Sequence, residues 1–98
     1  GQEWIPEKFQ VYNNYPNPFN PRTTIHYDLA ENGIVNITIY DMIGRQVVIL
    51  TDDYQLAGYR SIQWNSVNDF GQPVPAGVYL YTVRGKGFSQ TRKMLLLK

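Results

Sequence analysis

Residues 35–51 read VNITIYDMIGRQVVILT and carry the clearest structural signal in the chain. From Val35 to Tyr40, apolar and polar side chains alternate with a period of two, which is typical of a strand with one buried face. Asp41-Met42-Ile43-Gly44 then predicts a type I turn closed by a glycine in the left-handed conformation. Residues 45–51 return as the partner strand, with apolar side chains on both faces, so we expect an antiparallel hairpin here.

The same alternation recurs on both sides of this hairpin, whereas the sequence shows no sustained helical periodicity. The expected strands cover residues 9–12, 24–29, 35–40, 45–51, 59–65, 78–84 and 88–97, and the expected loops include 52–58 and 65–75. About seven short strands at this spacing indicate an all-β, immunoglobulin-like or fibronectin-like antiparallel β-sandwich. We expect residues 9–98 to form this single domain, and residues 1–8 to be a linker or a lead-in segment left by cloning.

Composition excludes several classes of function. The 98 residues leave room for one core, and a formal charge of +1 argues against a dedicated nucleic-acid binder. Because there is no cysteine, disulfides and thiolate chemistry are impossible. No apolar run approaches the ~20 residues of a membrane span, and no secretory signal opens the sequence. If the domain is exported, we therefore expect its signal peptide to lie upstream in a longer precursor.

Positive charge gathers in the last third of the sequence. After Asp69 there is no acidic residue, and the basic residues that follow are Arg84, Lys86, Arg92, Lys93 and Lys98. Such charges can simply keep an edge strand from pairing with a wrong partner. They can also orient a partner that adds a strand to the terminal hairpin. The two interpretations are compatible.

A proline-rich segment precedes the second expected strand. It consists of Pro16, Asn17, Pro18, Phe19, Asn20 and Pro21. Three prolines fix φ and keep the residues before them out of the α region, so we expect an extended, stiff stretch. We expect the Phe19 ring to anchor this segment to the sandwich, where the segment would cover a sheet edge.

Five motifs, in order along the chain, resemble a known family. They are Ile5-Pro6-Glu7 with the YPNPFNP run at 15–21, Ile39-Tyr40-Asp41 with Gly44-Arg45, Ala57-Gly58 with Trp64-Asn65, Pro75-Ala76-Gly77-Val78-Tyr79-Leu80-Tyr81, and Lys93-Met94-Leu95-Leu96-Leu97-Lys98. Together they resemble the C-terminal sorting domain of type IX secretion cargo, also called the Por secretion tail. Ala76 stands where that family more often has serine, and Asn65 where it more often has aspartate. The sequence also stops directly after the last strand, as members of that family do.

This resemblance implies a non-catalytic export signal. Such a tail folds in the periplasm, is read by an outer-membrane translocon and is removed by a cysteine-dependent sortase at the cell surface. The N-terminal cargo of the same precursor then stays on the surface or is set free, and the tail contributes no catalytic residue and no cofactor.

The resemblance and the basic C-terminal third together point to the last two strands as the recognition region. The residues expected there are Gly77, Val78, Tyr79, Tyr81, Arg92, Lys93 and Lys98. The residues expected to maintain the fold, besides the proline segment, are Asp41, Gly44, Arg45 and Trp64. Replacing Lys93 and Lys98 with glutamate should impair export without unfolding the domain.

Two other classes of function stay open. The same pattern is similar to the immunoglobulin-like domain of the flagellar hook-capping protein, which would make the chain a structural or adhesive module. Alternatively, aromatic side chains could form a sugar-stacking face, as in carbohydrate-binding modules appended to extracellular enzymes. The candidates are Trp4, Tyr40, Tyr54, Tyr59, Trp64, Tyr79 and Tyr81. For Trp64 we expect core packing, because it shares a strand face with Ile62.

Catalysis and metal binding have the least support. His26, the only histidine, falls on the polar face of its expected strand, and no serine lies in a nucleophile-elbow sequence. Asp52-Asp53 and Asn68-Asp69 could offer oxygen ligands to Ca²⁺, but neither pair has the spacing of a calcium loop. We expect solvated turn residues at both places.

Overall fold

The computed structural model describes residues 4–97, which form seven strands. These are β1 (Gln10–Val11), β2 (Thr23–Leu29), β3 (Gly33–Asp41), β4 (Gln46–Gln55), β5 (Gly58–Trp64), β6 (Gly77–Gly85) and β7 (Phe88–Leu96). Within the described residues there is no helix, and hence none long and apolar enough to cross a membrane. The prediction of an all-β sandwich of about seven antiparallel strands is confirmed.

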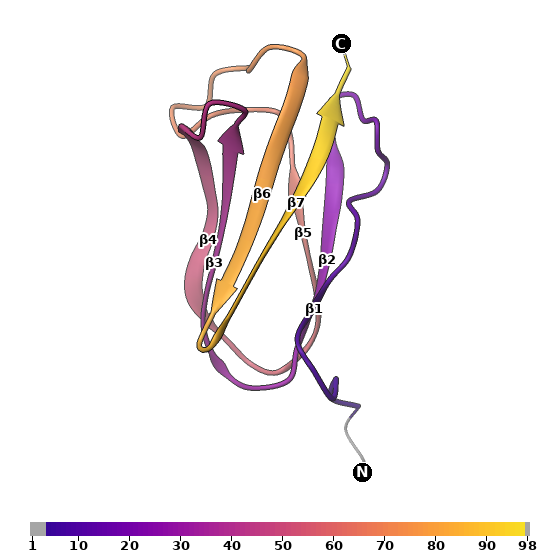
Figure 1. Cartoon of the computed structure of the whole chain (residues 1–98), viewed down its shortest axis with the longest axis vertical. Coiled ribbons are helices and arrows are strands. Elements are labelled where there is room, and N and C mark those ends of the chain that lie inside the picture. The colour runs from indigo at the N-terminus through magenta and orange to yellow at the C-terminus, as the bar shows by residue number, and fades with distance from the viewer. Residues whose placement is uncertain (1–3, 98) are drawn as a thin grey trace.

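The strands form two antiparallel sheets, ordered β1-β2-β5 and β4-β3-β6-β7 (Figure 1). The domain measures 45 × 22 × 20 Å along its principal axes. The segment before β1 and the β6–β7 turn lie at one end of the long axis, called the lower end after the view in Figure 1. The β3–β4 turn, the β5–β6 loop and the end of β7 lie at the opposite, upper end.

The core lies between the two sheets and follows the alternation read from the sequence. On β2, for example, Ile25, Tyr27 and Leu29 are buried while His26 is exposed. The buried apolar residues are Val11, Phe19, Ile25, Tyr27, Leu29, Val35, Ile37, Ile39, Val48, Trp64, Val74, Tyr79, Tyr81, Val83, Met94 and Leu96. Burial of one such side chain stabilises a fold by roughly 1.5–3 kcal/mol, so this cluster holds the sheets together.

The prediction of a loop after the β3–β4 hairpin is wrong. Residues 52–58 were expected to form a polar loop, but β4 continues to Gln55 and pairs with β3 as far as Gly33. Asp52 and Asp53 therefore lie in a strand. Polar residues are tolerated there because β4 is an edge strand, and both carboxylates are exposed to solvent. Two register shifts on the β3–β4 ladder accompany the run of apolar residues from Val47 to Leu50.

The proline segment lies along the β7 edge at the upper end. The Phe19 N–H donates to the Leu95 carbonyl at 3.0 Å, and the Leu97 N–H donates to the Phe19 carbonyl at 2.8 Å. The Asn17 side chain accepts the Leu95 N–H at 3.0 Å. Phe19 itself is buried against Trp64, with the ring centroids 5.8 Å apart. The segment bends along its length, so it is less extended than expected. Its three X–Pro peptide bonds are cis.

Candidate recognition surface

Strands β6 and β7 hold the residues that we expected to carry recognition, apart from Lys98, but the structure divides those residues into distinct environments. Tyr79 and Tyr81 point into the core and are buried. The Tyr81 hydroxyl donates to the Tyr12 carbonyl at 2.7 Å and accepts the Asn14 N–H at 3.0 Å. The Tyr79 hydroxyl donates to the Pro75 carbonyl at 2.6 Å. Burial raises the pKa of both phenols above the ordinary value. Both side chains thus stabilise the fold and do not face a partner.

Arg92 is also occupied within the domain. It is half-buried, its Nε donates to the Val11 carbonyl at 2.9 Å, and one terminal nitrogen donates to the Asn13 side chain at 3.0 Å. These bonds tie β7 of one sheet to the first strand of the other. The Arg92 guanidinium therefore holds the two sheets together at this edge. Because these bonds occupy it, it contributes little to orienting a partner.

The remaining residues lie on or beside the outer face of the four-stranded sheet. Lys93 is exposed and pairs across the ladder with Leu80, and half-buried Val78 pairs with Leu95. Gly77 opens β6. Lys98 lies outside the described residues. Lys93 is thus the basic residue of the terminal strand whose side chain is accessible.

The outer edge of β7 carries backbone N–H and C=O groups that could bind a partner strand, and the sequence did not indicate which residues supply them. Alternate residues of an antiparallel edge strand direct N–H and C=O groups away from the sheet. Leu95 does so, because its N–H and C=O bond to the proline segment. The ladder with β6 runs without a register shift, so Ser89, Thr91 and Lys93 face the same edge. Among residues 4–97, none offers these three a backbone partner on that side. We call residues 89–93 the open edge of β7.

The Asp41-Gly44-Arg45 motif forms a closed turn with a clear physical basis. One carboxylate oxygen of Asp41 accepts the N–H groups of Ile43 and Arg45 at 2.9 and 3.0 Å. The other carboxylate oxygen accepts the Arg45 side chain at 2.8 Å. These bonds, led by that from the Arg45 backbone, lower the pKa of Asp41 below its ordinary value. The motif therefore shapes the β3–β4 turn.

The aromatic residues that we considered for sugar stacking do not gather on one exposed face. Trp64 is buried, its indole nitrogen donates to the Val67 carbonyl at 2.9 Å, and Tyr79 packs edge-on against it. Of the exposed tyrosines, Tyr54 lies on β4 and Tyr59 on β5, which belong to different sheets. This arrangement gives no support to a sugar-stacking platform built from the aromatics named above.

In the described part of the chain, few polar side chains are placed for catalysis or metal binding. His26 is exposed on β2, and among residues 4–97 no three His, Asp or Glu side chains are grouped to hold a metal ion. Asp69 is engaged within the fold, where its two carboxylate oxygens accept the Ile49 N–H and the Gln46 side chain at 3.0 and 2.9 Å.

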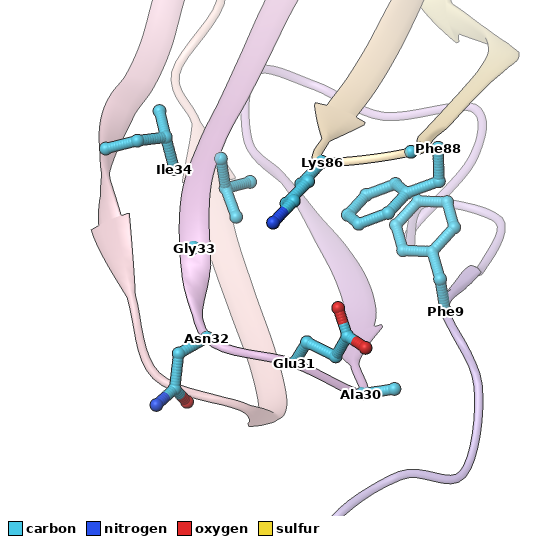
Figure 2. Close-up of a pocket in the computed structure, with 10 residues that line it drawn as sticks. Phe9, Ala30, Glu31, Asn32, Gly33, Ile34, Lys86 and Phe88 are labelled. Carbon is cyan, nitrogen blue, oxygen red and sulfur yellow. The ribbon is translucent and has the colours of Figure 1, made fainter.

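A cavity of about 220 Å³ lies at the lower end, between the β2–β3 connection and the β6–β7 turn (Figure 2). Phe9 and Phe88 stack face to face at its wall, with ring centroids 3.4 Å apart. The side chains of Glu31 and Lys86 lie beside it, and Ile34 contributes to its lining. The cavity could take a small apolar group beside the charged side chains of Glu31 and Lys86.

Comparison with known proteins assigns the family. The chain matches the family described as secretion system C-terminal sorting domain over residues 13–97. It is similar to a solved structure of dimeric latent PorU from Porphyromonas gingivalis, with 25% identity, a TM-score of 0.68, and coverage of 87% of this chain and 9% of that chain. It also shares its fold with PorZ, described as an essential bacterial surface component of the type IX secretion system of the same organism. In that case identity is 22%, the TM-score is 0.59, and coverage is 94% of this chain and 12% of that chain.

The search of curated proteins found no match. The chain spans only a small part of the two solved proteins that resemble it, 9% of one and 12% of the other. The family match covers the chain from the proline segment to the end of β7, including the β3–β4 turn, and leaves out only β1 among the strands of the described residues. The chain belongs to the family of secretion system C-terminal sorting domains, which direct proteins into type IX secretion.

Proposed function

We propose that this domain is the sorting signal of a longer precursor and that the secretion machinery reads it at the open edge of β7. In this proposal the domain folds in the periplasm, meets an outer-membrane translocon, and is cut from its cargo by a surface sortase. The cargo then remains on the cell surface or is released. The domain itself contributes shape and hydrogen bonds to these steps, and no catalytic group.

The open edge is the observation that carries the proposal. Ser89, Thr91 and Lys93 present unpaired backbone groups in a continuous row, the arrangement that accepts an added strand from a partner. Lys93 supplies an accessible positive charge beside that row. Leu95 and its neighbours are already covered by the proline segment, so a partner strand would be limited to the part of β7 nearer the lower end.

The test is export of a reporter fused ahead of residues 1–98 in a host with a working type IX system. Ser89→Pro removes one outward N–H and blocks strand addition, while Pro is compatible with an edge strand. Ser89→Ala is the matched control, because it removes the same hydroxyl and keeps the N–H. We expect Ser89→Pro to reduce the exported fraction by about tenfold, which corresponds to roughly 1.4 kcal/mol of lost binding, and Ser89→Ala to leave it unchanged.

Folding of both variants is checked by thermal unfolding of the purified domain. Equal export of the two folded variants would contradict recognition at the open edge. Retention of the unaltered fusion inside the cell, with the domain folded, would contradict the export role as a whole.

A further inference from the structure

Two turns at the upper end have the same five-residue construction, although they lie 27 positions apart in the sequence. They are residues 41–45 (DMIGR) and 68–72 (NDFGQ), which we call the twin turns. In each, the first residue's carbonyl accepts the N–H of the fourth residue, and its N–H donates to the carbonyl of the fifth. The four distances are 3.0 and 3.0 Å in the first turn and 2.9 and 2.9 Å in the second.

The side chain that opens each turn completes the match. Asp41 accepts the N–H groups of the third and fifth residues at 2.9 and 3.0 Å, and Asn68 does the same at 2.9 and 3.0 Å. The fourth residue is Gly44 in one turn and Gly71 in the other, with φ values of 93° and 78°. That left-handed conformation, which side chains with a Cβ rarely adopt, favours glycine in both turns, although a Cβ there would meet no other atom within 4 Å.

These rigid turns expose large apolar side chains. Met42, Ile43 and Phe70 are 62%, 79% and 87% exposed. The second turn is bonded to β4, the strand that begins directly after the first turn, because the Asp69 N–H donates to the Val47 carbonyl at 3.0 Å and the Asp69 carboxylate accepts the Ile49 N–H. The relative position of the two turns is therefore fixed by the fold. A protruding apolar surface held this firmly loses little conformational entropy when it is bound.

The place of the twin turns suits a partner other than the cargo. The segment that would lead to the cargo enters at the lower end, and the twin turns lie at the upper end of a domain 45 Å long. Exposed apolar groups at the end that points away from the cargo are free to enter a receptor site.

Charge favours a protein over a lipid surface. Asp41 is neutralised by Arg45 at 2.8 Å, and the Asp69 carboxylate lies directly before Phe70 in the second turn. The twin turns therefore lack the excess of basic residues that draws a surface onto anionic lipid. A carboxylate beside the most exposed ring also opposes its insertion into a bilayer.

We infer that the twin turns are a second docking surface, which inserts Ile43, Phe70 and Met42 into an apolar cleft on a protein of the secretion machinery. The inference rests on the proposed export role and adds the chemistry of the partner's binding site. It differs from recognition at the open edge, which uses backbone hydrogen bonds. Here the affinity comes from apolar side chains that become buried in the partner's cleft.

The test again uses the reporter fused ahead of residues 1–98 in a type IX host. The variant Ile43→Ser/Phe70→Ser removes the two most exposed anchors. The matched control is Tyr54→Ser/Leu56→Ser, which removes two side chains that are 60% and 57% exposed but lie away from the twin turns. We expect the twin-turn variant to export at least about tenfold less and the control to export normally. A second variant, Gly44→Ala/Gly71→Ala, keeps the apolar side chains but distorts both turns, and we expect it to reduce export as well.

Each outcome decides a different point. If the folded twin-turn variants export as well as the control, the docking surface is refuted while the export role stands. If the unaltered fusion stays inside the cell, the export role fails, and this inference fails with it.

Flotation of the purified domain with vesicles of phosphatidylcholine and phosphatidylglycerol tests the lipid alternative. Binding to these vesicles that is lost in Ile43→Ser/Phe70→Ser would overturn the protein cleft in favour of a membrane. Should Ile43→Ser/Phe70→Ser fail to fold, Ile43→Ala/Phe70→Ala takes its place.

Discussion

The hydroxyl of Tyr81 donates a 2.7 Å hydrogen bond to the carbonyl of Tyr12, 69 positions earlier in the chain. The same oxygen accepts the Asn14 N–H, so one phenol in the four-stranded sheet satisfies two backbone groups at the edge of the other sheet. Tyr81 and Asn14 are buried, so the Asn14 N–H has no ready access to solvent, whereas the bond to the Tyr12 carbonyl is partly buried. The Tyr81 side chain thus fixes where the segment after β1 lies relative to β6.

Replacing Tyr81 with phenylalanine should therefore destabilise the domain by about 2 kcal/mol, because one buried and one partly buried backbone group would lose their partner. The measurement is the free energy of unfolding in urea. Tyr79→Phe is the control, since the Tyr79 hydroxyl makes a single bond to Pro75 near the surface, and we expect a loss of about 1 kcal/mol. A smaller effect for Tyr81→Phe than for Tyr79→Phe would contradict the role given to the Tyr81 bonds.

The stability of the domain should fall at alkaline pH. Burial raises the pKa of Tyr27, Tyr79 and Tyr81 in the folded state above 10.0, whereas the unfolded chain should titrate near that ordinary value. Above that pH the folded state holds more protons than the unfolded one, so unfolding becomes easier as the pH rises. The contribution is fully present below pH 10.0 and is lost as the pH passes the raised values of the folded phenols.

Urea unfolding at a series of pH values, together with the ultraviolet absorbance of tyrosinate, measures this loss. The Tyr81→Phe variant should lose less stability over the same pH range, because one of the phenols with a raised pKa is gone. Equal pH dependence in the two proteins would show that Tyr81 titrates as an exposed tyrosine does.

The two neighbouring basic residues of β7 should separate folding from recognition. Arg92→Gln removes the bonds to Val11 and Asn13, so we expect a loss of about 1–2 kcal/mol in the free energy of unfolding. Lys93→Gln should leave that free energy within about 0.5 kcal/mol, because Lys93 is exposed. In the export assay, Lys93→Glu should reduce export of a fully folded domain. If Arg92→Gln proves as stable as the unaltered domain, the ties to Val11 and Asn13 do not hold the edge.

The fold was largely predictable because its signals are local. Alternation on β2, β3 and β6 reports which positions share a face, and the DMIG turn is specified by its own four residues. The end of β4 was missed because its polar residues pair with Gly33 and its neighbours, about 20 positions away. Local composition does not report such a pairing.

The recognition residues were harder to predict for a related reason. Val78 and Leu80 are as apolar as Tyr79 and Tyr81, so alternation separates the two sets but does not say which set is buried. The partner of Arg92 is a backbone carbonyl 81 positions away, which no motif announces. The match between the twin turns was visible in principle as D-x-x-G and N-x-x-G, although four residues are too few to indicate shared geometry.

Gly85 is required because the ring of Phe88 lies across it. The two residues face each other in the β6–β7 ladder, and a Cβ at Gly85 would overlap the Phe88 ring. That ring cannot simply swing away, since its other face stacks on Phe9. Gly85→Ala should therefore cost about 1–3 kcal/mol in the free energy of unfolding, as overpacking commonly does.

A double-mutant cycle isolates this contact. In a Phe88→Ala background the ring is absent, and Gly85→Ala should then be neutral or slightly stabilising, because alanine loses less backbone entropy than glycine on folding. The coupling free energy between the two substitutions, measured by urea unfolding of all four proteins, should approach the full cost of Gly85→Ala alone. Simple additivity would instead place the strain of Gly85→Ala in the turn itself, independent of the Phe9–Phe88 stack.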